Sequence, residues 1–364
     1  MNKAIYSVIT GSGSYIPENN IKNSDFLSHE FYEQNGEKIR KENSEIIDKF
    51  LEITTIEERR HVKEDLKTSD IAFFAAEKAI AAGRVDKEEL DYIILAHNFG
   101  DVSQTNKQVD IVPTLAARVK EKLQIENPFC VAYDVPFGCP GWLQGLIQAD
   151  YYIKSGDAKK ILVVGAEILS RVSDPHDRDS MLYADGAGAV IVEAVESDTP
   201  VGIVGHKTRS DTLHHAKMLH MSPSNNPDYH NKDEYFLKMF GRKLYQYALE
   251  FVPPLIKKCL DDKNMHVSDI DKVLIHQANG KMDDAILERL FKLYDIKEVN
   301  IPQYTMPMTI SWLGNTSVAT LPTLWDLLMK NEIKSNELTP GKNIVFASVG
   351  AGMNINAVIY KIPR

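Results

Sequence analysis

Three residues in this chain have side chains suited to nucleophilic catalysis: a cysteine, a histidine and an asparagine. Cys139 lies between two glycines, after an apolar β-type run and before Pro140, which suits the first turn of a helix. Unpaired N–H groups and the positive end of a helix dipole favour a thiolate at such a turn. We therefore predict a reactive thiol on a strand-to-helix turn. The alternative interpretation is a small buried hydrophobic residue, because free cysteine is among the most buried residue types.

A cysteine nucleophile needs a base or a polarising group, which can come from a distant part of the sequence. His276 follows the apolar run 272–275 and would lie at the carboxyl end of a strand, where open α/β sheets place ligand groups. Asn315 lies in a Gly-Asn-Thr-Ser turn that opens a helical pattern, so its side chain can also point out of a sheet end.

The elements that must position these residues alternate between strands and helices, which is typical of an α/β protein. Helix 68–82 should be capped by Thr68 or Ser69 and ended by Gly83. We expect residues 22–60 to be largely helical and residues 206–235 to be irregular. Pro253-Pro254 should interrupt a helix over 237–259. The predicted strands cover residues 4–13, 91–97, 129–135, 160–167, 186–193 and 272–275.

The pattern of the first half then starts again. Residues 85–97 are echoed by 267–276, and 160–167 by 343–350; the turn at Cys139 is echoed by the turn at Asn315. Echoes in the same order at a nearly constant offset indicate two copies of one βα module. We place the N-terminal module at residues 1–195 and the C-terminal module at 196–364. A pseudo-twofold pairing of the modules would bring Cys139, His276 and Asn315 to one pocket.

Composition excludes several classes of function. The chain has 364 residues, 43% of them apolar, and a formal net charge of −9, which argues against nucleic acid as a general partner. Its apolar runs are too short to cross a membrane and its N-terminus lacks a signal peptide, so we expect a cytoplasmic protein. Three cysteines are too few for a disulfide framework.

Two weaker signals predict no cofactor. Gly11-Ser-Gly13 follows a strand but lacks the third glycine of a dinucleotide fingerprint. The histidines between residues 206 and 230 fit no metal-ligand spacing, so we expect no metal site. They are His206, His214, His215, His220 and His230.

Several motifs together resemble the β-ketoacyl-acyl-carrier-protein synthase III family of the thiolase superfamily. The resemblance rests on residues 134–145, 161–167, 185–189, 276–279, 314–317 and 350–352. It implies a five-layered αβαβα fold built from two duplicated modules, a homodimer, and acyl carrier protein as partner. It also implies a catalytic triad of Cys139, His276 and Asn315.

The resemblance implies the following chemistry. Cys139 takes an acyl primer from a thioester, and N–H groups of Cys139 and the loop Gly350–Gly352 form the oxyanion hole. Malonyl-acyl-carrier protein then loses carbon dioxide, and His276 and Asn315 stabilise the enolate, which attacks the acyl group. The reaction requires no metal or redox cofactor.

The substrate-side residues only partly match the family. Arg178 matches a contact to the coenzyme A nucleotide, but the family's Trp and Arg before residues 56–61 are absent, so a carrier-bound primer is a competing prediction. Asn279 is expected to contact substrate, and Lys281 to dock carrier protein. Val112 or Ile111, in a long loop over 99–113, would reach the partner's acyl pocket and allow medium or branched chains.

Three other functions stay open. The first is a non-decarboxylative condensation or acyl transfer in specialised metabolism. The second is a thioester hydrolase with a Cys–His pair, for which no water-activating carboxylate is recognisable. The last is a non-catalytic synthase partner, which the presence of Cys139 disfavours.

Overall fold

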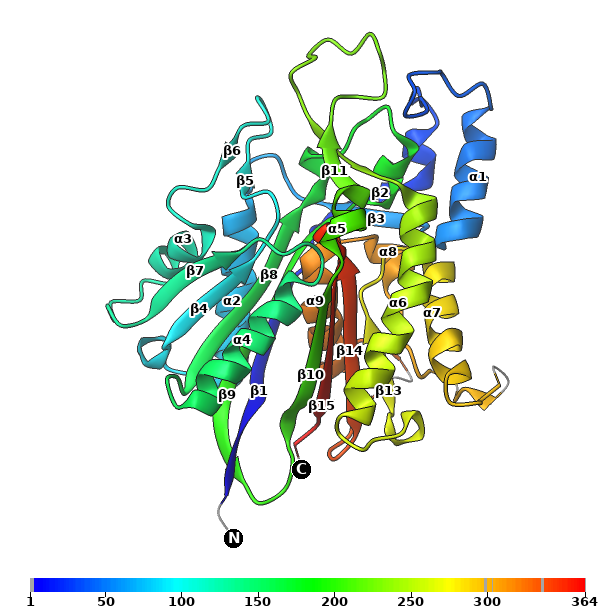
Figure 1. The fold of residues 1–364 in the computed structure, drawn as a ribbon. Helices are drawn as coiled ribbons and strands as arrows, with labels where there is room; N and C mark the ends of the chain where they lie inside the picture. The colour runs from blue at the N-terminus through cyan, green and yellow to red at the C-terminus, as the bar shows by residue number, and fades with distance from the viewer. Residues whose placement is uncertain (1–2, 298–299, 303, 335–336, 364) are drawn as a thin grey trace.

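The computed structural model describes residues 3–297, 300–302, 304–334 and 337–363. Two main sheets form its frame (Figure 1). The first sheet contains, in spatial order, β1 (Ala4–Tyr15), β9 (Asp185–Ser197), β8 (Lys160–Ile168), β4 (Tyr92–Ala96) and β7 (Val131–Val135). The second contains β10 (Gly202–Ser210), β15 (Asn354–Lys361), β14 (Asn343–Gly350) and β13 (Lys272–Ile275).

The two sheets repeat one topology. In the first, β1, β9 and β8 are antiparallel neighbours and β4 joins β8 in parallel. In the second, β10, β15 and β14 are antiparallel neighbours and β13 joins β14 in parallel. The strands predicted to correspond, β4 with β13 and β8 with β14, therefore occupy equivalent places. The module boundary after residue 195 falls within the last residues of β9 and stays a prediction.

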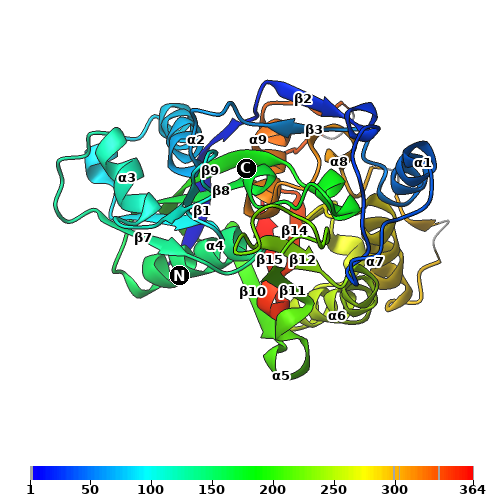
Figure 2. The same cartoon turned by 90° about the horizontal axis from the view of Figure 1, so that it is seen from above.

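Helices and sheets alternate in five layers, α-β-α-β-α, which confirms the predicted thiolase-like fold. One outer layer is α2 (Thr68–Gly83) and α3 (Leu115–Lys122). The middle layer is α4 (Gly141–Ser155) and α9 (Thr320–Met329), which contact strands of both sheets. Figure 2 shows these two helices between the sheets. The other outer layer is α6 (Gly241–Asp261) and α7 (Gly280–Lys292).

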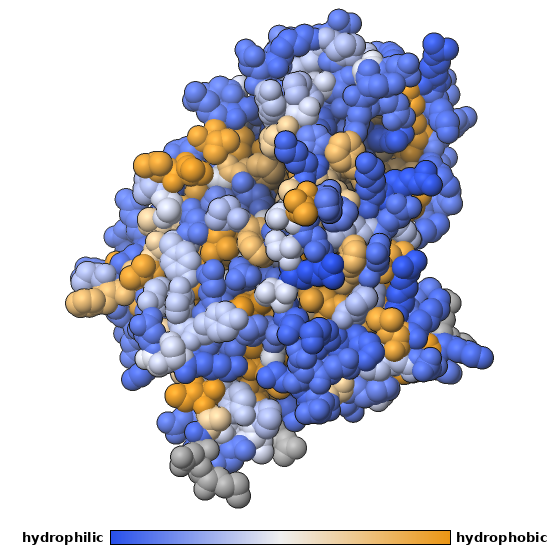
Figure 3. Space-filling view, viewed as in Figure 1, coloured by the Kyte–Doolittle hydropathy of each residue, from blue (hydrophilic) through white to orange (hydrophobic). Residues whose placement is uncertain are grey.

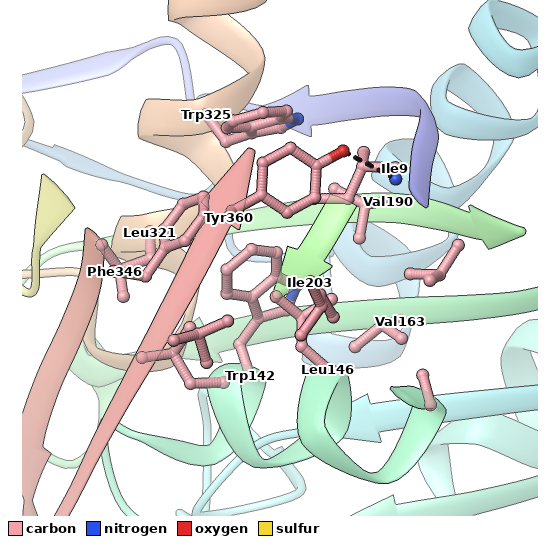
Figure 4. Close-up of a cluster of buried hydrophobic side chains, with 14 of the residues drawn as sticks. Ile9, Trp142, Leu146, Val163, Val190, Ile203, Leu321, Trp325, Phe346 and Tyr360 are labelled. Atoms are coloured by element: carbon pink, nitrogen blue, oxygen red, sulfur yellow. Dashed lines mark hydrogen bonds between the residues drawn. The ribbon is translucent and has the colours of Figure 1, made fainter. Parts of the chain in front are cut away.

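The middle layer exists because the strands are apolar on both faces. In β8, Ile161 and Val163 face the middle layer while Leu162 and Val164 face α2, as the two-residue period of a strand requires. Figure 4 shows the central cluster, with side chains from both middle helices and both sheets in contact. Its one labelled polar contact joins the halves, because the Tyr360 hydroxyl accepts from the Ile9 N–H at 3.0 Å.

The remaining elements lie mostly near one end of the sheets or border the loops there (Figure 1). They are α1 (Asn43–Thr54), α5 (Thr212–His215), α8 (Ile310–Leu313), β2 (Asn19–Lys22), β3 (Glu58–His61), β5 (Asp101–Val102), β6 (Val109–Asp110), β11 (Leu219–Ser222) and β12 (Phe236–Met239). Because β4 runs parallel to both β7 and β8, and β13 runs parallel to β14, the carboxyl ends of these strands and the following loops gather at common sheet edges.

Several predicted boundaries are wrong. Helix α6 starts at Gly241 and runs through Pro253 and Pro254 without interruption. Its apolar face, which includes Val252 and Ile256, is buried against the second sheet and outweighs the lost backbone bonds. Helix α2 is preceded by Lys67 as its N-cap residue, because the hydroxyl of Thr68 donates instead to the Gly100 carbonyl.

Two longer segments also differ from prediction. Residues 22–60 contain only one α-helix, α1, and end in β3, which pairs with β2. Residues 206–235 are less irregular than expected, because β10 extends to Ser210 and β11 pairs with β12. In both cases, pairing with a distant strand decides the conformation, which local propensity does not report.

Candidate active site

Cys139 lies on the turn between β7 and α4, with Pro140 as the N-cap residue of the helix. Gly138, just before it, has φ of +68°, which favours glycine, and a Cβ atom there would lie 2.7 Å from the Ala351 nitrogen. A Cβ atom on Gly350 would lie 2.5 Å from the Cys139 nitrogen. The cysteine turn and the loop after β14 therefore meet backbone to backbone.

The structure brings the three predicted catalytic residues to the wall of one cavity of about 840 Å³. Cys139 arrives from the first half of the chain, while His276 follows β13 and Asn315 precedes α9 in the second half. His276 and Asn315 are buried and Cys139 keeps a partly exposed surface, which faces the cavity. All three residues therefore border the same space, although they come from distant parts of the chain.

His276 is held as a neutral imidazole. Its side chain is 3% exposed, its backbone N–H donates to the Ala347 carbonyl at 2.9 Å, and its Nδ1 has no hydrogen-bond partner within the described ranges. Burial lowers the pKa of His276 to about 4. At neutral pH the ring is therefore uncharged, with one donor and one acceptor nitrogen.

Cys139 is a thiol at rest, contrary to the thiolate expected at a helix N-terminus. Burial raises the pKa of Cys139 to about 11; a hydrogen bond from Ser317 lowers it and the nearby Glu167 charge raises it. The helix α4 begins only at Gly141, two residues beyond the sulfur. Desolvation therefore outweighs the helix terminus.

Asn315 is oriented by its own turn. Its Oδ1 accepts the Ser317 N–H at 2.9 Å. Its backbone N–H donates to the Leu182 carbonyl and its carbonyl accepts the Ala184 N–H, each at 2.9 Å. With Oδ1 occupied by this bond, the amide NH₂ group is the part of the side chain left to donate into the cavity.

Comparisons with known proteins establish the family of this chain. Two models of 3-oxoacyl-[acyl-carrier-protein] synthase III, one for its C-terminal part, match residues 133–212 and 260–362. A β-ketoacyl-[acyl-carrier-protein] synthase III of Vibrio parahaemolyticus is 32% identical over 358 residues, which cover 98% of this chain and 100% of the relative. The chain belongs to the β-ketoacyl-acyl-carrier-protein synthase III family. It is therefore an acyltransferase of the condensing-enzyme type.

Solved structures agree. The 3-oxoacyl-[acyl-carrier-protein] synthase III of Aquifex aeolicus superposes with a TM-score of 0.77 at 28% identity, covering 97% of this chain and 99% of the other. That of Pseudomonas aeruginosa has a TM-score of 0.80 at 25% identity and covers 99% of each chain.

The remaining site residues that the family resemblance implied are less uniformly placed. Gly350 lines the cavity beside Cys139, as an oxyanion-hole residue must, whereas Gly352 lies further along the loop, with φ of +76° and Asn354 beside it. Asn279 lines the cavity, but its Oδ1 accepts the Met282 N–H at 3.1 Å and so caps α7. Its side chain therefore has a structural function in addition to any contact with substrate.

The residues predicted to meet substrate carriers lie toward the outside. Arg178 lines the cavity, half exposed, with its Nη1 3.1 Å from the Glu33 carboxylate. Lys281 is exposed at the start of α7, 3.7 Å from Glu52 of α1. Val112 is 82% exposed beyond β6 and does not line the cavity.

Sequence reasoning missed the apolar wall of the cavity. Ile46, Phe50 and Ile53 of α1 line it from one element, and Leu237 and Met239 of β12 from another. Burial alternates along β12: Phe236 and Lys238 are buried, and the alternate residues Leu237 and Met239 line the cavity, so the period of two was a usable signal. Sequence reasoning also missed Asn98 and gave Ser317 no role, although both line the cavity.

The described residues contain neither a metal-binding cluster nor a membrane-spanning helix. In residues 3–297, 300–302, 304–334 and 337–363, no three His, Cys, Asp or Glu side chains gather as a metal ion would require. No helix in those ranges is long and apolar enough to cross a membrane.

Proposed function

We propose that the chain condenses an acyl primer, carried on Cys139, with malonyl-acyl-carrier protein to give a β-ketoacyl thioester. The observation that supports this is the common cavity of Cys139, His276 and Asn315, in a chain of this family. The product would serve fatty acid or related polyketide synthesis.

In the first half-reaction, the sulfur of Cys139 attacks the carbonyl carbon of the primer thioester. His276 can take the proton of this thiol and pass it to the leaving thiolate. Because one thioester replaces another, the exchange costs little free energy. The negative oxygen of the intermediate would be held by N–H groups of the cysteine turn and the Gly350 loop, which are in backbone contact.

In the second half-reaction, the malonyl carboxylate leaves as carbon dioxide and its electron pair forms an enolate. The enolate oxygen would accept hydrogen bonds from the neutral ring of His276 and the NH₂ group of Asn315. The enolate carbon attacks acyl-Cys139, and the released thiolate takes a proton from solvent. These steps balance without any oxidant, reductant or metal, so we propose that no cofactor is needed.

We further propose that the primer arrives on acyl carrier protein and carries a medium or branched chain. The apolar wall from α1 and β12 suits an acyl chain. The Arg178 guanidinium, the candidate nucleotide contact, already pairs with Glu33, which would repel the phosphates of coenzyme A. Exposed Lys281 beside the mouth is the proposed docking contact for the acidic carrier protein.

The active unit would be a cytoplasmic homodimer. Strand β7 is an edge strand, and unpaired edges invite pairing with a second copy. Exposed apolar side chains border it and extend over the β5–β6 hairpin, where Figure 3 shows apolar atoms gathered on the surface. They are Val109, Ile111, Val112, Phe129 and Val131.

Intact-protein mass spectrometry tests the proposal. The protein is incubated with acetyl, octanoyl and branched acyl thioesters, each on coenzyme A and on acyl carrier protein. We expect a mass increase of one acyl group. The fraction of protein acylated should be larger with octanoyl-carrier protein than with acetyl-coenzyme A, and Cys139→Ala should not be acylated. Added malonyl-carrier protein should discharge the acyl group and release carbon dioxide.

Three outcomes would count against the proposal. Acylation retained in Cys139→Ala would place the nucleophile elsewhere. Discharge without carbon dioxide would favour non-decarboxylative transfer. Discharge by water alone would favour a hydrolase.

A further inference from the structure

The sulfur of Cys139 has one side-chain hydrogen bond within the described ranges, and it comes from Ser317 rather than His276. The Ser317 Oγ lies 3.4 Å from the Cys139 Sγ and is placed to donate. Ser317 is 4% exposed and has φ of +51°, an unusual conformation for a residue with a side chain. The bond from its N–H to Asn315 holds it there.

The hydroxyl of Ser317 is directed from behind by Asn98. The Asn98 Nδ2 donates to the Ser317 Oγ at 3.1 Å and to the Glu167 Oε2 at 2.6 Å, so both of its hydrogens are used. Because the serine oxygen accepts from this amide, its own proton is left for the sulfur. Hydrogen bonds in such chains polarise one another and gain strength.

Glu167 anchors the chain of bonds. It lies at the end of β8, is fully buried, and also accepts the Asn98 backbone N–H at 3.1 Å. The titratable groups that act on it or that it acts on are His97, after β4, and Cys139. Burial raises the pKa of Glu167 to about 7. The Glu167 carboxylate fixes which way the Asn98 amide faces, because it accepts from the amide NH₂ group and would repel the amide oxygen.

We infer that Ser317 donates a hydrogen bond to the reacting sulfur, and that Asn98 and Glu167 are positioning residues that set the direction of its hydroxyl. The inference deepens the proposed function, because it rests on Cys139 being the residue that is acylated. It assigns Ser317 a contact with the reacting atom, separate from those of His276 and Asn315. The donor would stabilise the thiolate each time acyl transfer creates it.

Ser317 and Glu167, at the two ends of this series of hydrogen bonds, should have opposite effects on the pKa of the Cys139 thiol. Removing the Ser317 hydroxyl removes a donor and should raise the pKa of Cys139, whereas removing the Glu167 charge should lower it. A merely structural role would not produce opposite signs.

The test is the rate at which iodoacetamide alkylates Cys139, followed by mass spectrometry between pH 7 and 11, because burial raises the pKa of Cys139 to about 11. We expect Ser317→Ala to raise the apparent thiol pKa by about one unit and to slow alkylation about tenfold at pH 8. Glu167→Gln should move the alkylation profile to lower pH and quicken the reaction at pH 8. Cys139→Ala gives the background from Cys130 and Cys259, which are both buried.

Two further variants keep the test decisive. Ser317→Gly suits the positive φ and preserves the turn, so it replaces Ser317→Ala if that variant unfolds. Thr320→Val is the matched control, because it deletes a buried hydroxyl that bonds Thr316 at 3.1 Å instead of the sulfur. It should leave the profile unchanged.

The inference is overturned if the folded Ser317→Ala and Ser317→Gly variants both leave the alkylation profile unchanged. Failure of the proposed function would look different. In that case no acyl thioester would load Cys139, while the alkylation profiles would still shift in opposite directions.

Discussion

At the scale of single residues, desolvation controls the chemistry of this site. It raises the pKa of the Cys139 thiol to about 11 and lowers the pKa of His276 to about 4. Both groups are therefore neutral at pH 7, and the resting pair is thiol and imidazole rather than thiolate and imidazolium. A neutral imidazole nitrogen can accept a proton in one tautomer and donate an N–H bond in the other, and the two proposed half-reactions need one of each.

The same burial makes an acid-sensitivity prediction at His276. The pKa of His276 is about 4 in the folded protein and has its ordinary value of 6.5 in the unfolded chain. Between these two pH values the unfolded chain therefore binds more protons than the folded protein. Stability that is present at pH 7 should therefore be lost as the pH falls through this window. The contribution of His276 to the loss between pH 7 and 4.5 should be about 2 kcal/mol.

Urea unfolding at pH 7 and 4.5 measures this effect. His276→Gln should lose less stability than the unmodified protein over the same pH interval. His214→Gln is the matched control, since His214 is exposed on α5, and it should behave like the unmodified protein. Equal losses in all three proteins would contradict the prediction.

At the scale of elements, the site is assembled by turns at strand ends and enclosed by short elements added around the frame. The turns carry Cys139, His276 and Asn315, while α1 and β12 supply much of the apolar wall. The alternation of β12 sends Leu237 into the cavity and Phe236 into the protein core. The frame therefore fixes the reaction, and the added elements fix the shape of the acyl chain that fits.

Leu237→Trp tests the role of β12. A larger ring in the cavity should shift acylation of Cys139 toward shorter chains, with the octanoyl-to-acetyl preference falling about tenfold. The measurement is competitive loading from a mixture of acyl-carrier proteins, read by mass spectrometry. Tyr235→Trp, at an exposed position two residues away, should leave the preference unchanged. An unaltered preference in Leu237→Trp would mean that the acyl chain lies elsewhere.

At the scale of the whole molecule, two equivalent sheets pack around α4 and α9, and this places the Cys139 and Asn315 turns at the same end of the molecule. Neither half contains all three residues of the proposed catalytic set. The first sheet also carries one more strand, β7, than the second sheet as described. That strand leaves the first half with an open edge and apolar neighbours.

The open edge of β7 predicts a dimer, and a charged side chain placed on that edge should dissociate it. Val131→Lys places a charge on β7, and we expect sedimentation velocity at low micromolar concentration to show a shift from dimer to monomer. Leu213→Lys is the matched control, because Leu213 is exposed on α5, away from that edge, and should stay dimeric. A Val131→Lys protein that sediments as the unmodified one would exclude β7 from the interface.

Much of this protein could be predicted from local patterns. Apolar runs located most of the strands of both main sheets, because a strand buried on both faces needs an unbroken apolar stretch. The repeat of those runs predicted the duplication, and motif spacing predicted that Cys139, His276 and Asn315 share a pocket. Prediction failed where distant contacts decide conformation, as in α6, which continues through Pro253 because its apolar face is buried.

The sequence by itself determined most of the strands of the two main sheets and their order along the chain, since these follow from apolar runs and from turn-forming residues. Only the tertiary structure decided the electrostatics of the site. No local pattern reveals that Cys139 would be desolvated enough to stay a thiol, or that Ser317, Asn98 and Glu167 from three separate segments would join behind it. The pKa of a side chain depends on what surrounds it in space, and those neighbours are assembled only when the two halves close around one cavity.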